Sequence, residues 1–131
     1  MSRPMHILII EDEENLSKLL SDRLRGEGFE VAVAADGVAG LAAAKEQKPD
    51  LVLLDIVIPR LDGMTLLRRM RAESWGSDIP VIMFTNLADD EKKIEAKALG
   101  ASFLIKSDLD LGEVVTNVQL ILGQAGKAGS V

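Results

Sequence analysis

Short apolar runs alternate along the chain with longer segments in which apolar and polar positions recur at helical spacing. The runs cover residues 5–10, 29–34, 51–54, 80–84 and 102–105. An almost uninterrupted apolar run bounded by polar residues is typical of a strand that is buried on both faces of a parallel sheet. The pattern therefore predicts five strands, each followed by a helix.

The segments between the runs carry signals for the ends and the buried faces of helices. Asp62 can cap the start of the third helix, and Asp110 with Glu113 resembles a capping box for the last one. Gly26 and Gly100 are typical of residues that end a helix. The fourth helix is expected to run from about residue 88 to residue 99. The apolar positions expected to face the core are Leu16, Leu19, Leu20 and Leu24 in the first helix, Leu66, Leu67 and Met70 in the third, and Val114, Val118, Ile121 and Leu122 in the last.

Successive strand-helix units of this length predict an α/β fold, a doubly wound five-stranded parallel sheet with helices on both faces. In open sheets of this kind, ligands bind beyond the carboxyl ends of the strands, where the strand order reverses. For the order 2-1-3-4-5, that point lies between strands one and three. The sequence thus predicts where a ligand site should lie before any side chain is considered.

Composition narrows the classes of function. The 131 residues fit one domain, which we expect to cover residues 1–123 and to be followed by a flexible tail over 124–131. Hydrophobic residues make up 47% and aromatic residues 3%, so the core must be aliphatic. The absence of cysteine excludes disulfides and thiolate zinc sites. A net charge of −6 argues against nucleic acid and anionic membranes as partners, and we expect a cytoplasmic protein without an export signal or anchor.

Residues with ligand chemistry follow four of the five predicted strands. Glu11 and Asp12 follow the first, Asp55 the third, Thr85 the fourth and Lys106 the fifth. Three carboxylates at one sheet edge repel each other, so a divalent cation is the natural counter-charge. Mg²⁺, or a similar ion such as Mn²⁺, would take two carboxylates and a backbone carbonyl near residue 57 and leave room for phosphate oxygens. Asp55 could then act as a nucleophile toward a phosphoryl group, with Lys106 as a fixed cation and Thr85 as a hydroxyl donor.

Each of these residues also has a purely structural interpretation. Asp12 could cap the first helix, Thr85 could simply end a strand, and Lys106 could be a solvated lysine. Phe103 is most simply a core aromatic. Asp55 is harder to explain in this way, because it lies between two aliphatic segments, where an unpartnered carboxylate would be costly to bury.

Over nearly its whole length the chain resembles the receiver domain of two-component response regulators, which has a flavodoxin-like topology. The strongest match is LVLLDIVIPRLDG (residues 51–63), with Asp55 at the position of the family's phosphoacceptor. The resemblance implies that Asp12 and Asp55 bind Mg²⁺ directly with the carbonyl of Val57, that Glu11 acts mainly through water, and that no organic cofactor is needed. It also implies that Lys106 binds the phosphoryl group, and that the residues expected to act as switches are Thr85 and Phe103.

The same resemblance implies a function and a set of partners. A sensor histidine kinase or a histidine phosphotransfer protein would supply the phosphoryl group, and the output surface would lie on the fourth helix, fifth strand and fifth helix. The protein would be a regulator that catalyses only its own phosphorylation and dephosphorylation, as a monomer or weak homodimer with a downstream protein target that the sequence does not identify.

Several positions depart from the family pattern. Ser107 replaces the usual proline after the lysine, so we expect a trans peptide bond there. Asn86 is bulkier than the residue common at its position and could narrow access to Asp55. Val57 and Leu87 flank the phosphoryl site in the family, and neither can orient an attacking water. Val57 and Leu87 together therefore predict slow self-dephosphorylation.

Three other functions can be weighed against the same residues. A phosphatase of the haloacid dehalogenase type needs a second acid two residues after the nucleophile, where this chain has Val57. A flavodoxin-like cofactor binder needs a phosphate loop rich in Ser, Thr and Gly after the first strand, where this chain has acids. The better rival is a receiver-like interaction module that works without phosphorylation.

Overall fold

The computed structural model describes residues 3–86, 89–108 and 110–123. The strands are β1 (His6–Ile10), β2 (Glu30–Ala34), β3 (Leu51–Leu54), β4 (Val81–Thr85) and β5 (Ser102–Ile105). The helices are α1 (Glu14–Gly26), α2 (Gly37–Gln47), α3 (Gly63–Ala72), α4 (Asp90–Ala98) and α5 (Leu111–Ile121), with a short 3-10 helix, η1 (Lys106–Asp108), after β5. The alternation of strand and helix that the apolar pattern predicted is confirmed.

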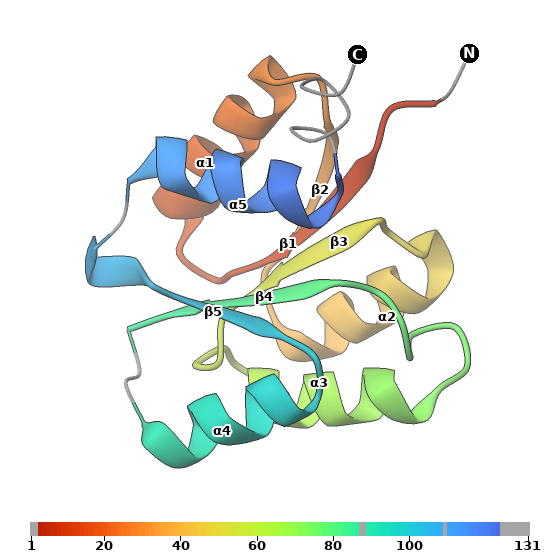
Figure 1. Cartoon of the computed structure of the whole chain (residues 1–131). Coiled ribbons are helices and arrows are strands. Elements are labelled where there is room, and N and C mark those ends of the chain that lie inside the picture. Colours follow the sequence, from red (N-terminus) through yellow and green to blue (C-terminus); the bar gives the residue numbers. More distant parts are fainter. Residues whose placement is uncertain (1–2, 87–88, 109, 124–131) are drawn as a thin grey trace.

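All five strands are parallel and lie in the order β2-β1-β3-β4-β5. Helices α1 and α5 cover one face of the sheet, and α2, α3 and α4 cover the other (Figure 1). The central strand β3 and its neighbour β4 are buried along their whole lengths, which is why their sequences are continuous apolar runs. The predicted doubly wound fold is therefore confirmed.

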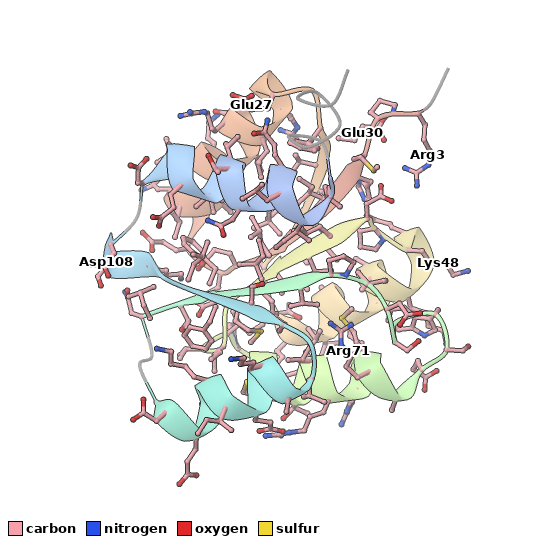
Figure 2. All side chains as sticks on the ribbon, viewed as in Figure 1. Arg3, Glu27, Glu30, Lys48, Arg71 and Asp108 are labelled. Atoms are coloured by element: carbon pink, nitrogen blue, oxygen red, sulfur yellow. The ribbon has the colours of Figure 1, made fainter. Side chains whose placement is uncertain are left out.

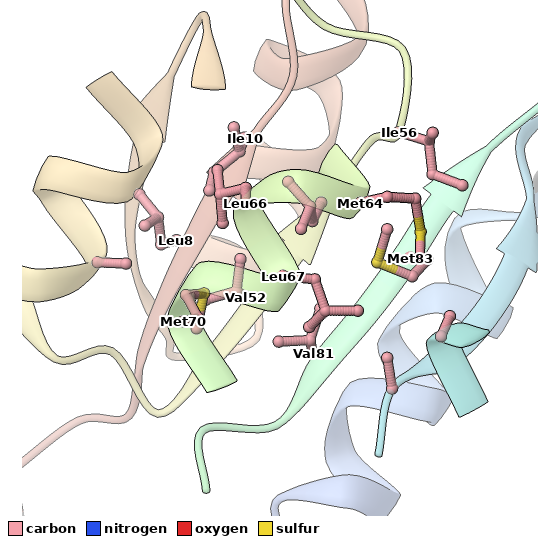
Figure 3. Packing of buried hydrophobic residues seen from close by; sticks show 14 of the residues in the cluster. Leu8, Ile10, Val52, Ile56, Met64, Leu66, Leu67, Met70, Val81 and Met83 are labelled. Atoms are coloured by element: carbon pink, nitrogen blue, oxygen red, sulfur yellow. The ribbon is translucent and has the colours of Figure 1, made fainter. Parts of the chain in front are cut away.

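The sheet separates two aliphatic cores, because successive side chains of a strand point to opposite faces. In β1, Leu8 and Ile10 face α2 and α3, whereas Ile7 and Ile9 face α1 and α5. The first core is shown in Figure 3, where the labelled residues include Val52, Ile56, Met64, Leu66, Leu67, Met70, Val81 and Met83. Each fully buried side chain of this size contributes about 1.5 to 3 kcal/mol, so a domain almost without aromatic residues can still be stable.

Charged side chains lie mainly at the periphery, and some of them tie elements together. Arg3, Glu27, Glu30, Lys48 and Asp108 lie at the outside of the molecule (Figure 2). Arg71, by contrast, donates hydrogen bonds to the backbone carbonyls of Leu99, Gly76 and Ile79 at 2.6 to 2.9 Å. Arg71 thereby supplies positive charge at the C-terminus of α4, since Leu99 caps that helix.

Aspartates cap four of the helices. The side chains of Asp36, Asp62, Asp89 and Asp110 accept hydrogen bonds from backbone N–H groups in the first turns of α2, α3, α4 and α5. The capping roles predicted for Asp62 and Asp110 are confirmed. Gly100, which follows α4, has a φ of 77°, a left-handed conformation that favours glycine.

Replacing Asp62 with alanine should lower the free energy of unfolding by about 1 kcal/mol at neutral pH, because the Thr65 N–H loses its acceptor at 3.0 Å. Burial alone would raise the pKa of Asp62, but hydrogen bonds from Thr65 outweigh it and lower that pKa below its usual value. A lowered folded-state pKa stabilises above the ordinary aspartate pKa of about 4 and ceases to do so as the pH falls through the folded value. Urea unfolding at neutral pH and at about pH 3 measures both effects.

The control for this prediction is Asp22→Ala, which removes an exposed pair with Lys18. Its effect should stay below about 0.5 kcal/mol. A loss for Asp62→Ala that is no larger than the control, or that grows on acidification, would contradict the capping interpretation.

The predicted buried faces of two helices need correction. Leu19 of α1 is 50% exposed and Ile121 of α5 is 37% exposed. In α1 the arc nearest the sheet includes Ser17 and Ser21, two polar residues that an apolar pattern does not select. In α5 the arc is formed by Val114, Val115 and Val118, so the helix is rotated relative to the expected face.

Element boundaries differ from the predicted ones by one or two residues. The helix α4 begins at Asp90, whereas its start was expected near residue 88, which lies outside the described residues. The tail over 124–131 also lies outside them, so the domain boundary after residue 123 stays a prediction. Among the described helices, none combines the length and the apolarity that a bilayer crossing requires.

Candidate functional site

The side chains expected to form a site lie together at the carboxyl edge of the sheet. Glu11 and Asp12 follow β1, Asp55 follows β3, and Lys106 follows β5. Thr85 is the last residue of β4 and is 1% exposed. A cavity of about 300 Å³ at this edge is lined by Asp55, Val57, Thr85, Asn86 and Lys106. Parallel pairing of β1 with β3, β3 with β4 and β4 with β5 brings these distant residues to one place.

Lys106 bridges two buried carboxylates. Its Nζ donates a hydrogen bond to Asp55 Oδ2 at 2.7 Å and forms an ion pair with Glu11 Oε1. The side chains of Lys106, Glu11 and Asp55 are only 12%, 2% and 7% exposed. The alternative of a solvated Lys106 is therefore wrong, and its expected proximity to Asp55 is confirmed.

The backbone orients both carboxylates. The N–H of Glu13 donates to Glu11 Oε2 at 2.9 Å, and the N–H of Val57 donates to Asp55 Oδ1 at 3.2 Å. One oxygen of each acid is thus held by the chain, while the other faces the Lys106 ammonium. This arrangement leaves the acids fixed in position beside the cavity.

Burial and the contacts between opposite charges shift the pKa values of Glu11 and Lys106 in opposite directions. Burial raises the pKa of Glu11 above its usual value, and the contacts with Lys106 and with the Glu13 N–H only partly offset it. For Lys106, burial alone would lower the pKa, but hydrogen bonds to Asp55 and Glu11 outweigh it and raise that pKa. Lys106 is therefore charged at neutral pH and compensates the acids around it.

Carboxylate oxygens of Glu11, Asp12 and Asp55 lie within 4.8 Å of one another. Glu11 and Asp55 are buried, whereas Asp12 is exposed, so the cluster is reachable from one side. Hard oxygen donors in this number suit Mg²⁺ or Mn²⁺, which keep several water ligands. The residues present therefore fit a divalent cation. The carbonyl of Val57 as a further ligand stays a prediction.

The alternative role of Asp12 as a helix cap is wrong. The capping position of α1 is occupied by Glu13, and no side chain among the described residues caps that helix. Asp12 instead lies at the open side of the acidic cluster. Leu87, expected to flank the site, lies outside the described residues.

Phe103 lies on β5 and is half-buried. It packs against the core beneath α4, and the ammonium of Lys93 lies 5.7 Å from the ring centre. The interpretation as a core aromatic is thus partly right, since one part of the ring remains at the surface. Its expected role as a switch stays a prediction.

Sequence reasoning missed two supports of the site. The ring of Phe84 lies 5.9 Å from the Lys106 ammonium and forms an apolar wall beside it. Gly63 packs so closely on the site loop that an added Cβ would lie 2.2 Å from the carbonyl oxygen of Asp55. The Asp62-Gly63 pair was recognisable as part of the motif, but the contact that requires glycine depends on the tertiary fold.

Ser107 departs from the family pattern without disturbing Lys106. No cis peptide bond occurs in the described residues, so the expected trans bond between Lys106 and Ser107 is confirmed. These residues form η1, the short 3-10 helix after β5.

Comparisons with known proteins agree with this geometry. The family model described as "Response regulator receiver domain" matches residues 7–119. The chain is 37% identical over 116 residues to the DNA-binding dual master transcriptional regulator RpaA of Synechocystis, covering 88% of this chain and 48% of that protein. It is 36% identical over 113 residues to the DNA-binding response regulator MtrA of Mycobacterium bovis, covering 86% of this chain and 48% of that protein.

Solved structures give the same result. A putative response regulator from Chloroflexus aurantiacus superimposes with a TM-score of 0.83 at 33% identity, covering 92% of this chain and 98% of that chain. The chemotaxis protein CheY4 of Vibrio cholerae gives a TM-score of 0.82 at 28% identity, covering 90% of this chain and 98% of that chain.

The chain spans about half the length of the curated relatives it matches. Two of these relatives are named as DNA-binding regulators, so they do not support the expectation that nucleic acid is excluded as a partner. The topology, the acidic edge and the match over most of the sequence lead to one conclusion: the chain belongs to the family of response regulator receiver domains.

Proposed function

We propose that this domain is a signalling switch that accepts a phosphoryl group on Asp55 from a sensor histidine kinase or a histidine phosphotransfer protein. The observation that carries the proposal is the Lys106 ammonium, which lies 2.7 Å from Asp55 Oδ2 inside a buried acidic site. A merely structural acid at this position would not need two further carboxylates within 4.8 Å, nor a place in the wall of a cavity.

In the proposed reaction, a carboxylate oxygen of Asp55 forms a bond to phosphorus while the bond from phosphorus to the donor's imidazole nitrogen breaks. The electron pair of that bond returns to the imidazole. The Val57 N–H orients Asp55, and Lys106 supplies positive charge beside the incoming phosphoryl oxygens. Thr85, at the end of β4, offers its hydroxyl to one of those oxygens.

Glu11, Asp12 and Asp55 would hold Mg²⁺ or Mn²⁺, with the Val57 carbonyl as a further ligand. When bound, the ion neutralises negative charge on the phosphoryl oxygens as they approach the acids. Asp12 and Asp55 are proposed as direct ligands and Glu11 as one that acts mainly through water.

We infer that the signal passes to the surface of α4, β5 and α5. Thr85 pairs in register with Ile105 of β5, so a shift at Thr85 reaches the strand that carries Phe103. Phe103 shares a surface hollow with Lys93, Ile94 and Lys97 of α4. Inward packing of Phe103 would change the shape of this hollow, and a downstream protein would bind according to that change.

The phosphorylation site has a regulatory role in this proposal. We also propose that the protein is cytoplasmic and is a monomer or a weak homodimer.

Acetyl phosphate, a small phosphoryl donor, tests the proposal without a kinase. We expect the purified domain to gain one phosphoryl group in intact-mass spectra only when Mg²⁺ is present, and Asp55→Asn to gain none. Asp22→Asn, which changes an exposed acid on α1, is the control and should be labelled like the wild type. Absence of labelling with a folded wild-type domain would favour the rival function, an interaction module that works without phosphorylation.

The phosphorylated state should be long-lived, because Val57 cannot hold a water for attack on the phosphoryl group. Val57 is 64% exposed at the rim of the cavity, and its side chain carries no hydrogen-bonding atom. Replacing Val57 with asparagine should speed loss of the phosphoryl group several-fold, because the amide can hydrogen-bond a water and orient it toward the phosphorus. The decay of the phosphorylated mass after removal of the donor measures the rate, and equal rates would refute this explanation.

A further inference from the structure

A second cavity of about 300 Å³ lies between α2 and α3 and is distinct from the acidic site. This α2–α3 pocket is lined by Leu41, Lys45, Arg69, Ala72, Glu73 and Trp75. Leu41 and Trp75 also pack against the core beneath these helices, so the floor of the pocket is apolar and fixed. The charged residues lie on its rim and are exposed.

The pocket lies far from the phosphorylation edge. Gly63, at the start of α3, contacts the backbone of Asp55, whereas Ala72 ends the same helix. Because an α-helix rises about 1.5 Å per residue, Gly63 and Ala72 lie about 14 Å apart along the axis of α3. Occupation of the α2–α3 pocket therefore leaves access to Asp55 open.

Two cations on the rim stand out among the basic residues of this face. Arg60 pairs with Asp36, and Arg68 pairs with Glu95. Lys45 and Arg69 form no ion pair with any residue in the described ranges. Glu73 is the one acid in the pocket lining, so two cations against one acid leave the rim with a net positive charge. In a chain whose net charge is −6, this makes the pocket a local site for negative charge.

Trp75 provides a second, independent observation. It is the single tryptophan of the chain, and its indole Nε1 is enclosed without a hydrogen-bond acceptor in the described part of the structure. Leaving a buried N–H without an acceptor costs about 1 to 3 kcal/mol, and native proteins keep few such groups. Trp75 lines the pocket, so a ligand there would lie against an indole whose N–H donor is still unsatisfied.

We propose that the α2–α3 pocket binds an acidic segment of a partner protein, which inserts one apolar side chain between Leu41 and Trp75 and places carboxylates near Lys45 and Arg69. A protein segment is favoured over a small molecule because the cavity lies at the lower limit of ligand pockets, about 300 Å³, and its rim is exposed. One anchoring side chain fits this space, and the remaining contacts would form outside it, as at the centre of many protein interfaces.

The single tryptophan makes the test specific, because the domain has one indole N–H cross-peak in a proton–nitrogen NMR spectrum. The probe is a blocked peptide with one leucine between pairs of glutamates. We expect a saturable shift of the indole cross-peak, half-complete at about 1 mM or below. The same peptide with serine in place of leucine, or with lysines in place of glutamates, should bind at least about tenfold more weakly.

Variants of the domain complete the test. The double variant Lys45→Gln, Arg69→Gln changes two exposed residues and should weaken binding about tenfold or more. The double variant Lys18→Gln, Arg23→Gln removes the same charge from α1 and should bind like the wild type. Asp55→Asn should also bind like the wild type, so the result does not depend on phosphorylation. No saturable shift, an equal response to the lysine peptide, or unchanged binding by the first double variant would each overturn the proposal.

Discussion

Replacing Lys106 with methionine should lower the free energy of unfolding of the metal-free domain by about 3 to 5 kcal/mol at neutral pH. The side chains of Lys106, Glu11 and Asp55 are 12%, 2% and 7% exposed, so the ammonium compensates two acids that water hardly reaches. Methionine fills similar space but carries no charge. The two carboxylates would then repel each other in a site that water reaches only from one side.

The pH dependence of this effect has a definite sign. Without Lys106, the contact that partly offsets burial is lost, so the pKa of Glu11 should lie further above its unfolded value. Its protonated form then favours the folded state, and this benefit is lost as the pH rises. The difference between variant and wild type should therefore shrink when the pH is lowered from about 7 to about 5. Mg²⁺ should also recover part of the lost stability, because it replaces the missing positive charge.

Lys18→Met is the matched control for this prediction. Lys18 also pairs with an aspartate, but both side chains are more than half exposed. Its loss should change the free energy of unfolding by less than about 0.5 kcal/mol. Urea unfolding of the wild type and both variants at the two pH values, with and without Mg²⁺, measures these free energies of unfolding. A Lys106→Met effect as small as the control would mean that water screens the site far more than its burial implies.

Replacing Gly63 with alanine should destabilise the domain by about 3 kcal/mol and also reduce labelling of Asp55 by acetyl phosphate. The new Cβ would lie 2.2 Å from the carbonyl oxygen of Asp55 and 2.7 Å from the Cα of Ile56. Both are backbone atoms, so the overlap can be relieved only by moving the loop between β3 and α3. That movement would stretch the hydrogen bond from the Gly63 N–H to the Ile56 carbonyl, now 2.8 Å, and displace the phosphoacceptor.

Gly26→Ala separates this steric effect from the general effect of glycine. Gly26 is the last residue of α1, has no atom within 4 Å of an added Cβ and does not need a left-handed conformation. Alanine there should be neutral or stabilise by up to about 1 kcal/mol. Thermal or urea unfolding of both variants provides the comparison, and equal effects would show that the close approach at Gly63 is not what limits the substitution.

The fold could be predicted because its signals are local and repeated. A continuous run such as Leu51–Leu54 is buried on both faces and was predicted at its observed boundaries. Parallel topology then placed Asp55 and Lys106 at the same edge, although 51 residues separate them. The geometry of the acidic site therefore followed from strand order and from which residue comes after each strand.

Other features depend on contacts that a pattern of apolar residues does not contain. Ser17 and Ser21 occupy the buried arc of α1, so Leu19 was wrongly assigned to the core. The close packing of Gly63 on Asp55 and the enclosed indole of Trp75 arise from how α3 and its following loop pack. In each of these cases, the deciding neighbour lies elsewhere in the chain.

Locating the transferred phosphoryl group provides the sharpest test. The domain is treated with acetyl phosphate and Mg²⁺, the acyl phosphate is trapped by borohydride reduction, and tryptic peptides are sequenced by mass spectrometry. Residues 46–60 form one tryptic peptide, which contains both Asp50 and Asp55. We expect the modification on Asp55 alone, since Asp50 lies beyond the other end of β3 and pairs with Arg3. Modification of Asp50, Asp12 or Glu11, or of no residue in a folded domain, would contradict the assignment of Asp55 as the phosphoacceptor.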